Sequence, residues 1–217
     1  MVNLKLNLIN ENFSGLKDIK RIYEEAFPKD EIIPLDIVLL LAKEGLAKIF
    51  AICDDDSLIG FISILLGDKL VYGLHLAIDS KLRGKGYGTK TFDLLKETTE
   101  GKPLFYVVES LDENAINYNQ RVKRVNLYER LGFKFYDMKL NIMREPMDVM
   151  GSDGLTHDLI LNEFGIIFSR IMDFAVKNKD LVLDYYKQNN LDLESIENLL
   201  NIYENNKENM EVLLKNF

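Results

Sequence analysis

The segment of this chain best suited to chemistry is a basic, glycine-dense turn at residues 83–88, with the sequence RGKGYG. Glycine has no side chain, so a ligand can come close to the bare backbone of such a turn. An apolar run precedes it, and residues 89–100 follow it with apolar positions at helical spacing. A helix N-terminus attracts anions, and Arg83 and Lys85 add positive charge. The pattern predicts a phosphate-binding loop between a strand and a helix.

The spacing of the glycines distinguishes between kinds of phosphate-binding loop. A P-loop requires GxxxxGK[ST], and no Gly-Lys-Ser/Thr triplet occurs at this turn. The dinucleotide fingerprint GxGxxG belongs near the first strand of a βαβ unit, whereas this turn reads GxGxG after several strand-like segments. The pattern [Arg/Gln]-x-x-Gly-x-[Gly/Ala] remains, and Arg83, Gly86 and Gly88 satisfy it. The alternative interpretation is a glycine-rich surface turn without a ligand.

A second motif, NLYERLGF, spans residues 126–133. Its helical pattern ends at Gly132 and the strand-like FKFYD follows, as expected where a glycine stops a helix. Tyr128 within the motif carries a phenol, which is protonated at pH 7 and able to give its proton to a thiolate. The alternative role for Tyr128 is packing at the end of the helix.

Together the two motifs resemble the coenzyme side of the GNAT family of N-acetyltransferases, which bind acyl-coenzyme A. The resemblance covers roughly residues 2–145. It implies an acyl-CoA-dependent N-acyltransferase that moves acetyl from acetyl-CoA, its acyl-donor co-substrate, to an amine by direct attack. It also implies that Tyr128 protonates the departing thiolate, and that backbone N–H groups at Leu76, Ala77 and Ile78 polarise the thioester carbonyl. The loop residues expected to bind the coenzyme are Arg83, Gly84, Lys85, Gly86, Tyr87, Gly88 and Thr89.

The order of strand-like and helical segments agrees with this resemblance. An alternating segment, NLKLNLI, is followed by two helical segments and three strand-like runs before the glycine turn. After the helix that follows the turn come the strand PLFYVVES, a helix from about Asn114 to Leu131, and strands at FKFYD and KLNIM. The order predicts an α/β (α+β) domain with the acetyltransferase fold, a central mixed and mostly antiparallel sheet flanked by helices.

Two arginines precede Tyr128 in the run QRVKR at residues 120–124. At helical spacing Arg124 lies one turn and Arg121 two turns before Tyr128, so the three share a face. Guanidinium groups bind phosphate or carboxylate bidentately, so this pair is suited to coenzyme phosphates or to a carboxylate on the acceptor. The alternative, a solvated basic stripe, applies better to Lys123.

The general base has several candidates. In a small bacterial subgroup that shares FP-x-x-E-x-x-P at residues 27–34, a glutamate often stands at the strand position held here by Leu74. The remaining candidates are Glu109, His75, Glu31 or a water molecule. A histidine within a strand is more often structural, although its pKa near neutrality suits amine deprotonation. We favour Glu109, because it ends a strand beside the expected cleft, where burial tunes carboxylates toward base chemistry.

The composition fits a cytoplasmic enzyme, and the resemblance to the small bacterial subgroup implies a bacterial source. Of the 217 residues 47% are hydrophobic and the net charge is −8, which argues against disorder and against nucleic-acid binding. The single cysteine, Cys53, lies in an apolar run and is expected to be a buried free thiol. The longest apolar stretch, residues 32–50, is interrupted by charges, so we expect no membrane span, and the N-terminus does not resemble a signal peptide. No metal-ligand spacing occurs, so no metal is expected.

The chain is expected to have three parts: an acetyltransferase domain at 1–147, a turn-prone linker at 148–154 and an acidic, all-α extension at 155–217. Large apolar residues recur at helical spacing in the extension, with Asp192 a plausible N-cap of the last helix. The first apolar stripe comprises Ile160, Phe164, Ile167, Phe168, Ile171 and Phe174. Such a stripe requires a packing partner. Because two-fold homodimers are the commonest oligomers, a homodimer is the favoured interpretation and packing onto the core the alternative.

The resulting hypothesis is an N-acetyltransferase whose partner is a small-molecule or peptide amine. The alternative is a non-catalytic acyl-CoA-binding module that uses the helical extension to associate with other proteins. Binding of acetyl-CoA without turnover on a panel of amines would favour the module.

Overall fold

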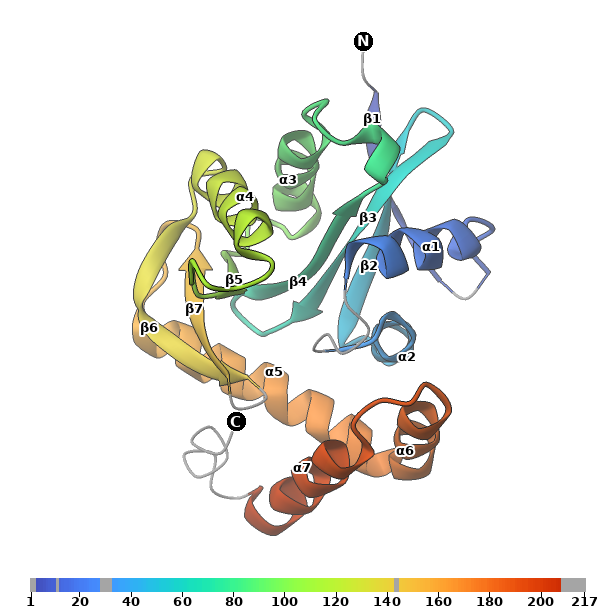
Figure 1. Ribbon diagram of the computed structural model, residues 1–217, viewed down its shortest axis with the longest axis vertical. Helices are drawn as coiled ribbons and strands as arrows, with labels where there is room; N and C mark the ends of the chain where they lie inside the picture. Colours follow the sequence, from blue (N-terminus) through green and yellow to red (C-terminus); the bar gives the residue numbers. More distant parts are fainter. Residues whose placement is uncertain (1–2, 11, 28–32, 143–144, 208–217) are drawn as a thin grey trace.

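A seven-stranded sheet forms the centre of the protein, and helices cover both of its faces (Figure 1). The computed structural model describes residues 3–10, 12–27, 33–142 and 145–207. The strands are β1 Leu4–Leu8, β2 Ala47–Asp54, β3 Ser57–Leu66, β4 Val71–Ile78, β5 Leu104–Glu109, β6 Lys134–Ile142 and β7 Glu145–Gly151. The helices are α1 Leu16–Ala26, α2 Leu35–Lys43, α3 Tyr87–Thr98, α4 Tyr118–Arg130, α5 His157–Lys177, α6 Lys179–Gln188 and α7 Leu193–Asn206, with a 3₁₀ turn at Ser80–Leu82.

The strand order is β1-β2-β3-β4-β5-β7-β6, and β4 and β5 run parallel while the other neighbours are antiparallel. The expected fold class, a mixed and mostly antiparallel sheet flanked by helices, is therefore confirmed. β4 and β5 pair only at Val71–Leu104 and Tyr72–Phe105. Both strands continue beyond these pairs without pairing to each other, and parallel strands end at the same edge of a sheet. We call the space between Gly73–Ile78 and Tyr106–Glu109 the β4–β5 wedge.

The helices divide the buried apolar residues into two layers, one on each face of the sheet. α1, α2 and α5 cover one face, and α3 and α4 cover the other (Figure 1). Successive residues of a strand point to opposite faces, so Phe105 packs in the first layer and Tyr106 in the second. Residues of the second layer therefore lie on the side of the sheet that carries the predicted loop helix and the predicted Tyr128 helix.

The C-terminal helices pack on the same chain. Ile160, Phe164, Ile167 and Phe174 of α5 are buried in the first layer. α6 and α7 pack against the end of α5 in a small cluster of their own. The alternative prediction, packing onto the core, is therefore confirmed for α5. A homodimer was favoured because the apolar stripe requires a packing partner, and for α5 the core of the same chain is that partner. The side chain of Asp192 accepts a hydrogen bond from Ser195 N at 3.0 Å, which confirms the predicted N-cap of α7.

Two polar contacts fasten α5 to the turn between β3 and β4. The buried carboxylate of Glu163 accepts a hydrogen bond from the backbone N–H of Lys69 at 2.9 Å. Arg170 forms an ion pair with Asp68 at 2.7 Å. The extension is therefore joined to the sheet by buried apolar surface and by specific polar contacts together.

The predicted boundary between domain and linker is wrong. Residues 148–151 belong to strand β7, which pairs with β5 on one side and β6 on the other. Val149 and Met150 are fully buried, one in each layer. The small residues of VMGSDG suggested a linker, but the turn comes only after Gly151. The sheet is complete only with β7, so the domain that contains the sheet extends past residue 147.

Two further details differ from the sequence-based expectations. β6 is a single strand with a register shift between Tyr136 and Lys139, where two strands were expected. α4 begins at Tyr118 and not near Asn114, because Asp112 holds the preceding segment in a turn: its side chain accepts the Asn114 N–H at 2.9 Å. Cys53 is buried and free, as expected. Among the described residues, no helix is long and apolar enough to cross a membrane.

Candidate active site

The glycine turn joins the end of β4 to the start of α3. Asp79 follows β4, and its side chain accepts a hydrogen bond from the backbone N–H of Lys81 at 3.0 Å, which closes the 3₁₀ turn. The Nε of Arg83 donates to the backbone oxygen of Ile78 at 3.0 Å. Gly84 and Gly86 then adopt left-handed conformations with φ of +80° and +78°, and Gly86 is the N-cap of α3. These two glycines reverse the chain so that the N-terminus of α3 faces the edge of the sheet.

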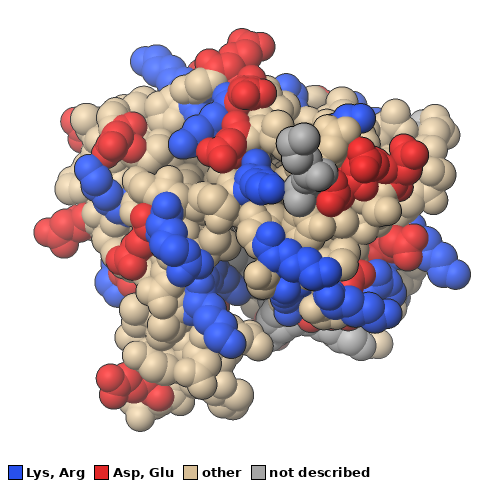
Figure 2. Space-filling model, turned by 90° about the horizontal axis from the view of Figure 1, so that it is seen from above, with Lys and Arg blue, Asp and Glu red and all other residues tan. Residues whose placement is uncertain are grey.

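This turn has the properties of an anion site. Residues 83–86 are exposed, and no hydrogen bond to another described group engages the backbone N–H groups of Gly84, Lys85 and Gly86. The N–H groups of the first helical turn have no intrahelical acceptors either. No described carboxylate pairs with Arg83 or Lys85. On the face seen from above, Lys and Arg side chains gather across the middle (Figure 2). The predicted phosphate-binding loop thus has free donors and unpaired positive charge.

A polar network ties the start of this turn to α1. Arg21 forms ion pairs with Asp79 at 2.6 Å and with Glu25 at 2.8 Å. Ser80 donates a hydrogen bond to Glu25 at 3.1 Å. The hydrogen bond from Arg21 holds the pKa of Asp79 below its usual range. The network is mostly exposed to solvent, so its role is to position the turn more than to stabilise the fold.

Tyr128 lies in the second layer, where α4 packs on β5. It is 6% exposed, and its ring stacks on that of Tyr106 with centroids 4.4 Å apart. Phe92 of α3 meets it edge-on at 6.2 Å. Burial raises the pKa of Tyr128 to about 12, and the nearby Arg124 opposes this shift. Tyr128 is therefore a protonated phenol at neutral pH, held on the wall of the β4–β5 wedge by aromatic packing.

The predicted base and the two predicted arginines meet at the open end of this wall. Glu109 accepts from Arg121 Nη2 at 2.9 Å and from Arg124 Nη1 at 3.2 Å. Asn117 donates to the same carboxylate at 2.9 Å. The side chain of Glu109 is 24% exposed, so it still reaches solvent. The carboxylate is thus held in one orientation by three donors.

The two arginines differ in how fully they are engaged. Beyond Glu109, Arg121 donates through Nε to Asn117 at 2.7 Å and through Nη1 to the backbone oxygen of Ser110 at 2.8 Å. All three of its nitrogens therefore have an acceptor. Arg124 has a hydrogen bond to Glu109 alone among the described groups, and its side chain is 32% exposed. Of the pair, Arg124 is the one with donors still free for a ligand.

His75 has the surroundings of a structural histidine. A register shift in the β3–β4 ladder places Ser63 opposite His75 and Ile64 opposite Gly73, so Leu74 has no opposite residue. Such a bulge turns two successive side chains to one face, and both Leu74 and His75 contact first-layer residues. His75 is 2% exposed, and its Nδ1 lies 2.9 Å from Ser63 Oγ.

Burial lowers the pKa of His75 to about 3, so its ring is neutral at physiological pH. The rings of Tyr23, Phe27 and Phe61 surround it. An incoming amine would have to displace this packing to reach the imidazole. The other candidate base, Glu31, lies outside the described residues.

Comparisons with known proteins agree with this geometry. Residues 45–135 match the family model of the acetyltransferase (GNAT) domain, which spans β2 to the start of β6 and includes the glycine turn and Tyr128. The chain carries a GNAT acetyltransferase domain. No curated protein matches the sequence.

Solved structures extend the likeness of the GNAT domain beyond the matched segment. A putative GNAT acetyltransferase from Bacteroides thetaiotaomicron is 25% identical, with a TM-score of 0.63 over 76% of this chain and 94% of the other. An aminoglycoside 6'-N-acetyltransferase complexed with coenzyme A is 17% identical, with a TM-score of 0.53 over 68% and 96%. An acetyltransferase from Thermus thermophilus is 15% identical, with a TM-score of 0.52 over 70% and 98%. The last two show the fold only.

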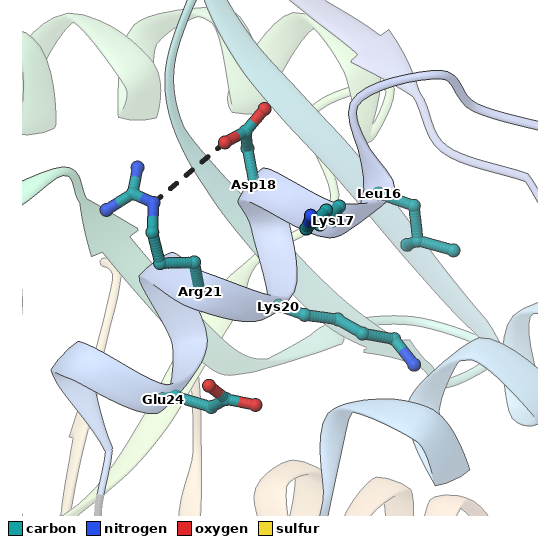
Figure 3. Close-up of a pocket in the computed structure, with 6 residues that line it drawn as sticks. All are labelled: Leu16, Lys17, Asp18, Lys20, Arg21 and Glu24. Carbon is teal, nitrogen blue, oxygen red and sulfur yellow. Dashed lines mark ion pairs between the residues drawn. The ribbon is translucent and has the colours of Figure 1, made fainter.

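A surface hollow of about 590 Å³ lies on α1, and Arg21, which pairs with Asp79 at the start of the glycine turn, is part of its lining (Figure 3). Its lining residues all come from one helix and are mostly charged: Leu16, Lys17, Asp18, Lys20, Arg21 and Glu24. A hollow formed by one exposed helix has no converging walls. We therefore place the site at the loop and the wedge.

Sequence reasoning missed two features of the site. Asp79 and Arg21, which anchor the loop, are 58 residues apart, and neither belongs to a recognisable motif. Tyr106 occupies an inward position of an apolar strand, so its pattern indicated only core packing. Among the described residues, no cluster of three potential metal ligands is present.

Proposed function

We propose that this protein is an N-acetyltransferase that transfers acetyl from acetyl-CoA to a small-molecule or peptide amine. One observation carries the proposal: the glycine turn, the β4–β5 wedge and buried Tyr128 adjoin at one edge of the sheet. The turn supplies N–H donors and cations for the coenzyme phosphates. The unpaired halves of β4 and β5 leave backbone groups for the rest of the coenzyme arm. The family match supports catalysis over the binding-module alternative.

The backbone of β4 narrows the predicted contacts of the thioester carbonyl. Asp79 N donates to Ile59 O across the β3–β4 ladder. In an antiparallel ladder every second residue directs its backbone N–H group at the neighbouring strand, so the N–H group of Ala77 also points toward β3. Leu76 and Ile78 then point their N–H groups away from β3, into the wedge. We assign the N–H group of Leu76, the one nearer Gly73, and not that of Ala77, to polarising the thioester carbonyl. The N–H of Ile78 lies about 6.6 Å farther along the strand, so it cannot share the same oxygen and is left for the coenzyme arm.

The reaction follows as direct transfer. The neutral amine attacks the thioester carbonyl carbon, a C–N bond forms and the C–S bond breaks. The electron pair of that bond passes to sulfur, and Tyr128 protonates the resulting thiolate. The proton lost by the amine passes to Glu109 or to a water that Glu109 orders. Arg121 and Asn117 hold Glu109 in place for this step, and Arg124 directs its free donors at the coenzyme or at an acidic acceptor.

Thiol release from acetyl-CoA with a panel of amines tests this function. Solved relatives of the same fold act on an aminoglycoside and on spermidine, so the panel includes both, with amino acids and short peptides. We expect amine-dependent release with at least one class. Tight acetyl-CoA binding without amine-dependent release from any member would favour the binding module. Failure to bind acetyl-CoA would contradict both.

A further inference from the structure

Tyr106 on β5 holds a buried hydroxyl without a partner. The residue is 2% exposed, and among the described residues its Oη is the buried side-chain polar atom that no hydrogen bond satisfies. Buried hydroxyls almost always have a partner, because an unpaired one loses its bonds to water without replacement. A phenylalanine would fill the same space without this cost. The hydroxyl therefore requires an explanation beyond packing.

The hydroxyl lies at the apex of the β4–β5 wedge. Tyr106 and Gly73 directly follow the last pair between the two strands, Tyr72–Phe105. The far end of the Tyr106 ring, with its hydroxyl, occupies the space that a Cβ atom at residue 73 would take. Glycine at 73 is therefore what allows the ring to reach across to β4. The phenol bridges the two strands where they begin to separate.

The apex is also where the far end of a bound coenzyme arm would arrive. The phosphate-binding turn follows β4 at the open end of the wedge. An arm held there by its phosphates and lying along β4 points its sulfur toward Gly73. Tyr106 and Tyr128 stack at this apex, with ring planes only 21° apart. The two phenols thus form one aromatic wall at the position expected for the sulfur.

We propose that the Tyr106 hydroxyl donates a hydrogen bond to the coenzyme sulfur, as a second phenol beside Tyr128. This inference rests on the proposed function. As the C–S bond breaks, negative charge collects on sulfur, and Tyr128 transfers its proton to it. Tyr106 keeps its own proton and stabilises the charge until that transfer is complete. Hydrogen bonds to a charged acceptor are stronger than neutral ones, so the contact favours the transition state over the bound thioester.

Tyr106→Phe removes the hydroxyl and keeps the ring, the stack on Tyr128 and the contact with Gly73. We expect its affinity for coenzyme A to fall about fivefold and its affinity for desulfo-coenzyme A, which lacks the sulfur, to stay unchanged. The turnover number should fall about 10- to 100-fold, as expected when a hydrogen bond to a charged group is lost. The melting temperature should not fall, because the substitution removes an unpaired polar group.

Tyr72→Phe is the matched control. It removes a hydroxyl from the neighbouring strand, but on the opposite face of the sheet, where Tyr72 stacks on Phe105. The ratio of the two coenzyme affinities should match that of the unaltered protein.

Each other outcome contradicts the assignment. Equal losses of affinity for coenzyme A and desulfo-coenzyme A, or no loss for either, would show that Tyr106 serves packing alone. A lower melting temperature with an unchanged affinity ratio would indicate a buried water as the partner. Failure of the unaltered protein to bind either ligand would overturn the proposed function itself, and this inference with it.

Discussion

The two walls of the β4–β5 wedge carry the same kinds of residue but hold them differently. On the β4 side, Arg83 and Lys85 are exposed on a glycine turn, without a described carboxylate partner. On the β5 side, Arg121 and Arg124 share Glu109, and Tyr128 is buried in aromatic packing. Free charge and bare backbone suit binding of a flexible anionic ligand. Side chains fixed by neighbours suit chemistry, because they need no reorganisation when the reaction occurs.

The comparison predicts that substitutions on the β5 side lower turnover more than they lower coenzyme affinity. Tyr128→Phe tests this with the largest expected effect. Loss of a general acid lowers the rate about 10²–10⁴-fold, and the ring keeps its stack on Tyr106. Stopped-flow turnover and calorimetry with acetyl-CoA separate rate from affinity. An unchanged rate, with chemistry shown to be the slow step, would leave Tyr128 a packing residue.

Replacing one arginine on each wall of the wedge with glutamine tests whether the two walls differ in their contribution to acetyl-CoA affinity. Arg83→Gln should weaken acetyl-CoA binding about 10- to 100-fold, as expected for a lost bond to a charged group. Arg124→Gln should change the affinity for acetyl-CoA less than about threefold, because Arg124 already pairs with Glu109 and its remaining donors are free for an acidic acceptor. Calorimetry under one salt condition compares the two. Similar losses in both variants would show that the α4 arginines grip the phosphates as well.

Within the β5 side, the number of contacts predicts which arginine stabilises the fold. Arg121 has acceptors for all three nitrogens, and Arg124 for one among the described groups. Arg121→Gln should lower the free energy of unfolding by about 1–3 kcal/mol, since it leaves part-buried acceptors unpaired. Arg124→Gln should lower the free energy of unfolding by a smaller amount. Urea denaturation measures the free energy of unfolding of both variants. A larger loss in Arg124→Gln than in Arg121→Gln would contradict the role given to Arg121 in holding Glu109.

The smallest effect concerns His75, which we exclude as a base. Its folded-state pKa of about 3 lies below the ordinary 6.5, so between these values the unfolded chain binds a proton that the folded chain does not. Stability should therefore decrease as the pH falls below about 6.5. In His75→Gln this dependence should become shallower by up to one proton. Urea midpoints from pH 7.5 to 5 measure this dependence. Parallel curves for the two proteins would show that folding does not lower the pKa of His75, and would contradict this account.

The features found from sequence are those that short segments specify. The glycine turn, its helix and the Tyr128 motif each lie within about a dozen residues, so glycine conformation and helical spacing reveal them. The ion pairs of Glu109 depend on how α4 docks on β5, and no local pattern encodes that docking. Strand β7 was missed because Gly151 and the residues after it resemble a linker, whereas Val149 and Met150 are buried through pairing with distant strands. The surface that covers the apolar stripe of α5 could not be predicted either, because it is set by tertiary packing.

The central claim is that the turn before α3 binds the phosphates of an acyl-CoA. Calorimetric titration of acetyl-CoA into the unaltered protein, Gly86→Asp and Gly101→Asp tests it most directly. Both glycines have positive φ, +78° and +74°, and open space around the Cβ position, so the two substitutions strain the backbone alike. Gly101 follows α3 at its other end, away from the turn. The account predicts that Gly86→Asp abolishes measurable binding and that Gly101→Asp binds like the unaltered protein; equal affinity in all three would contradict it.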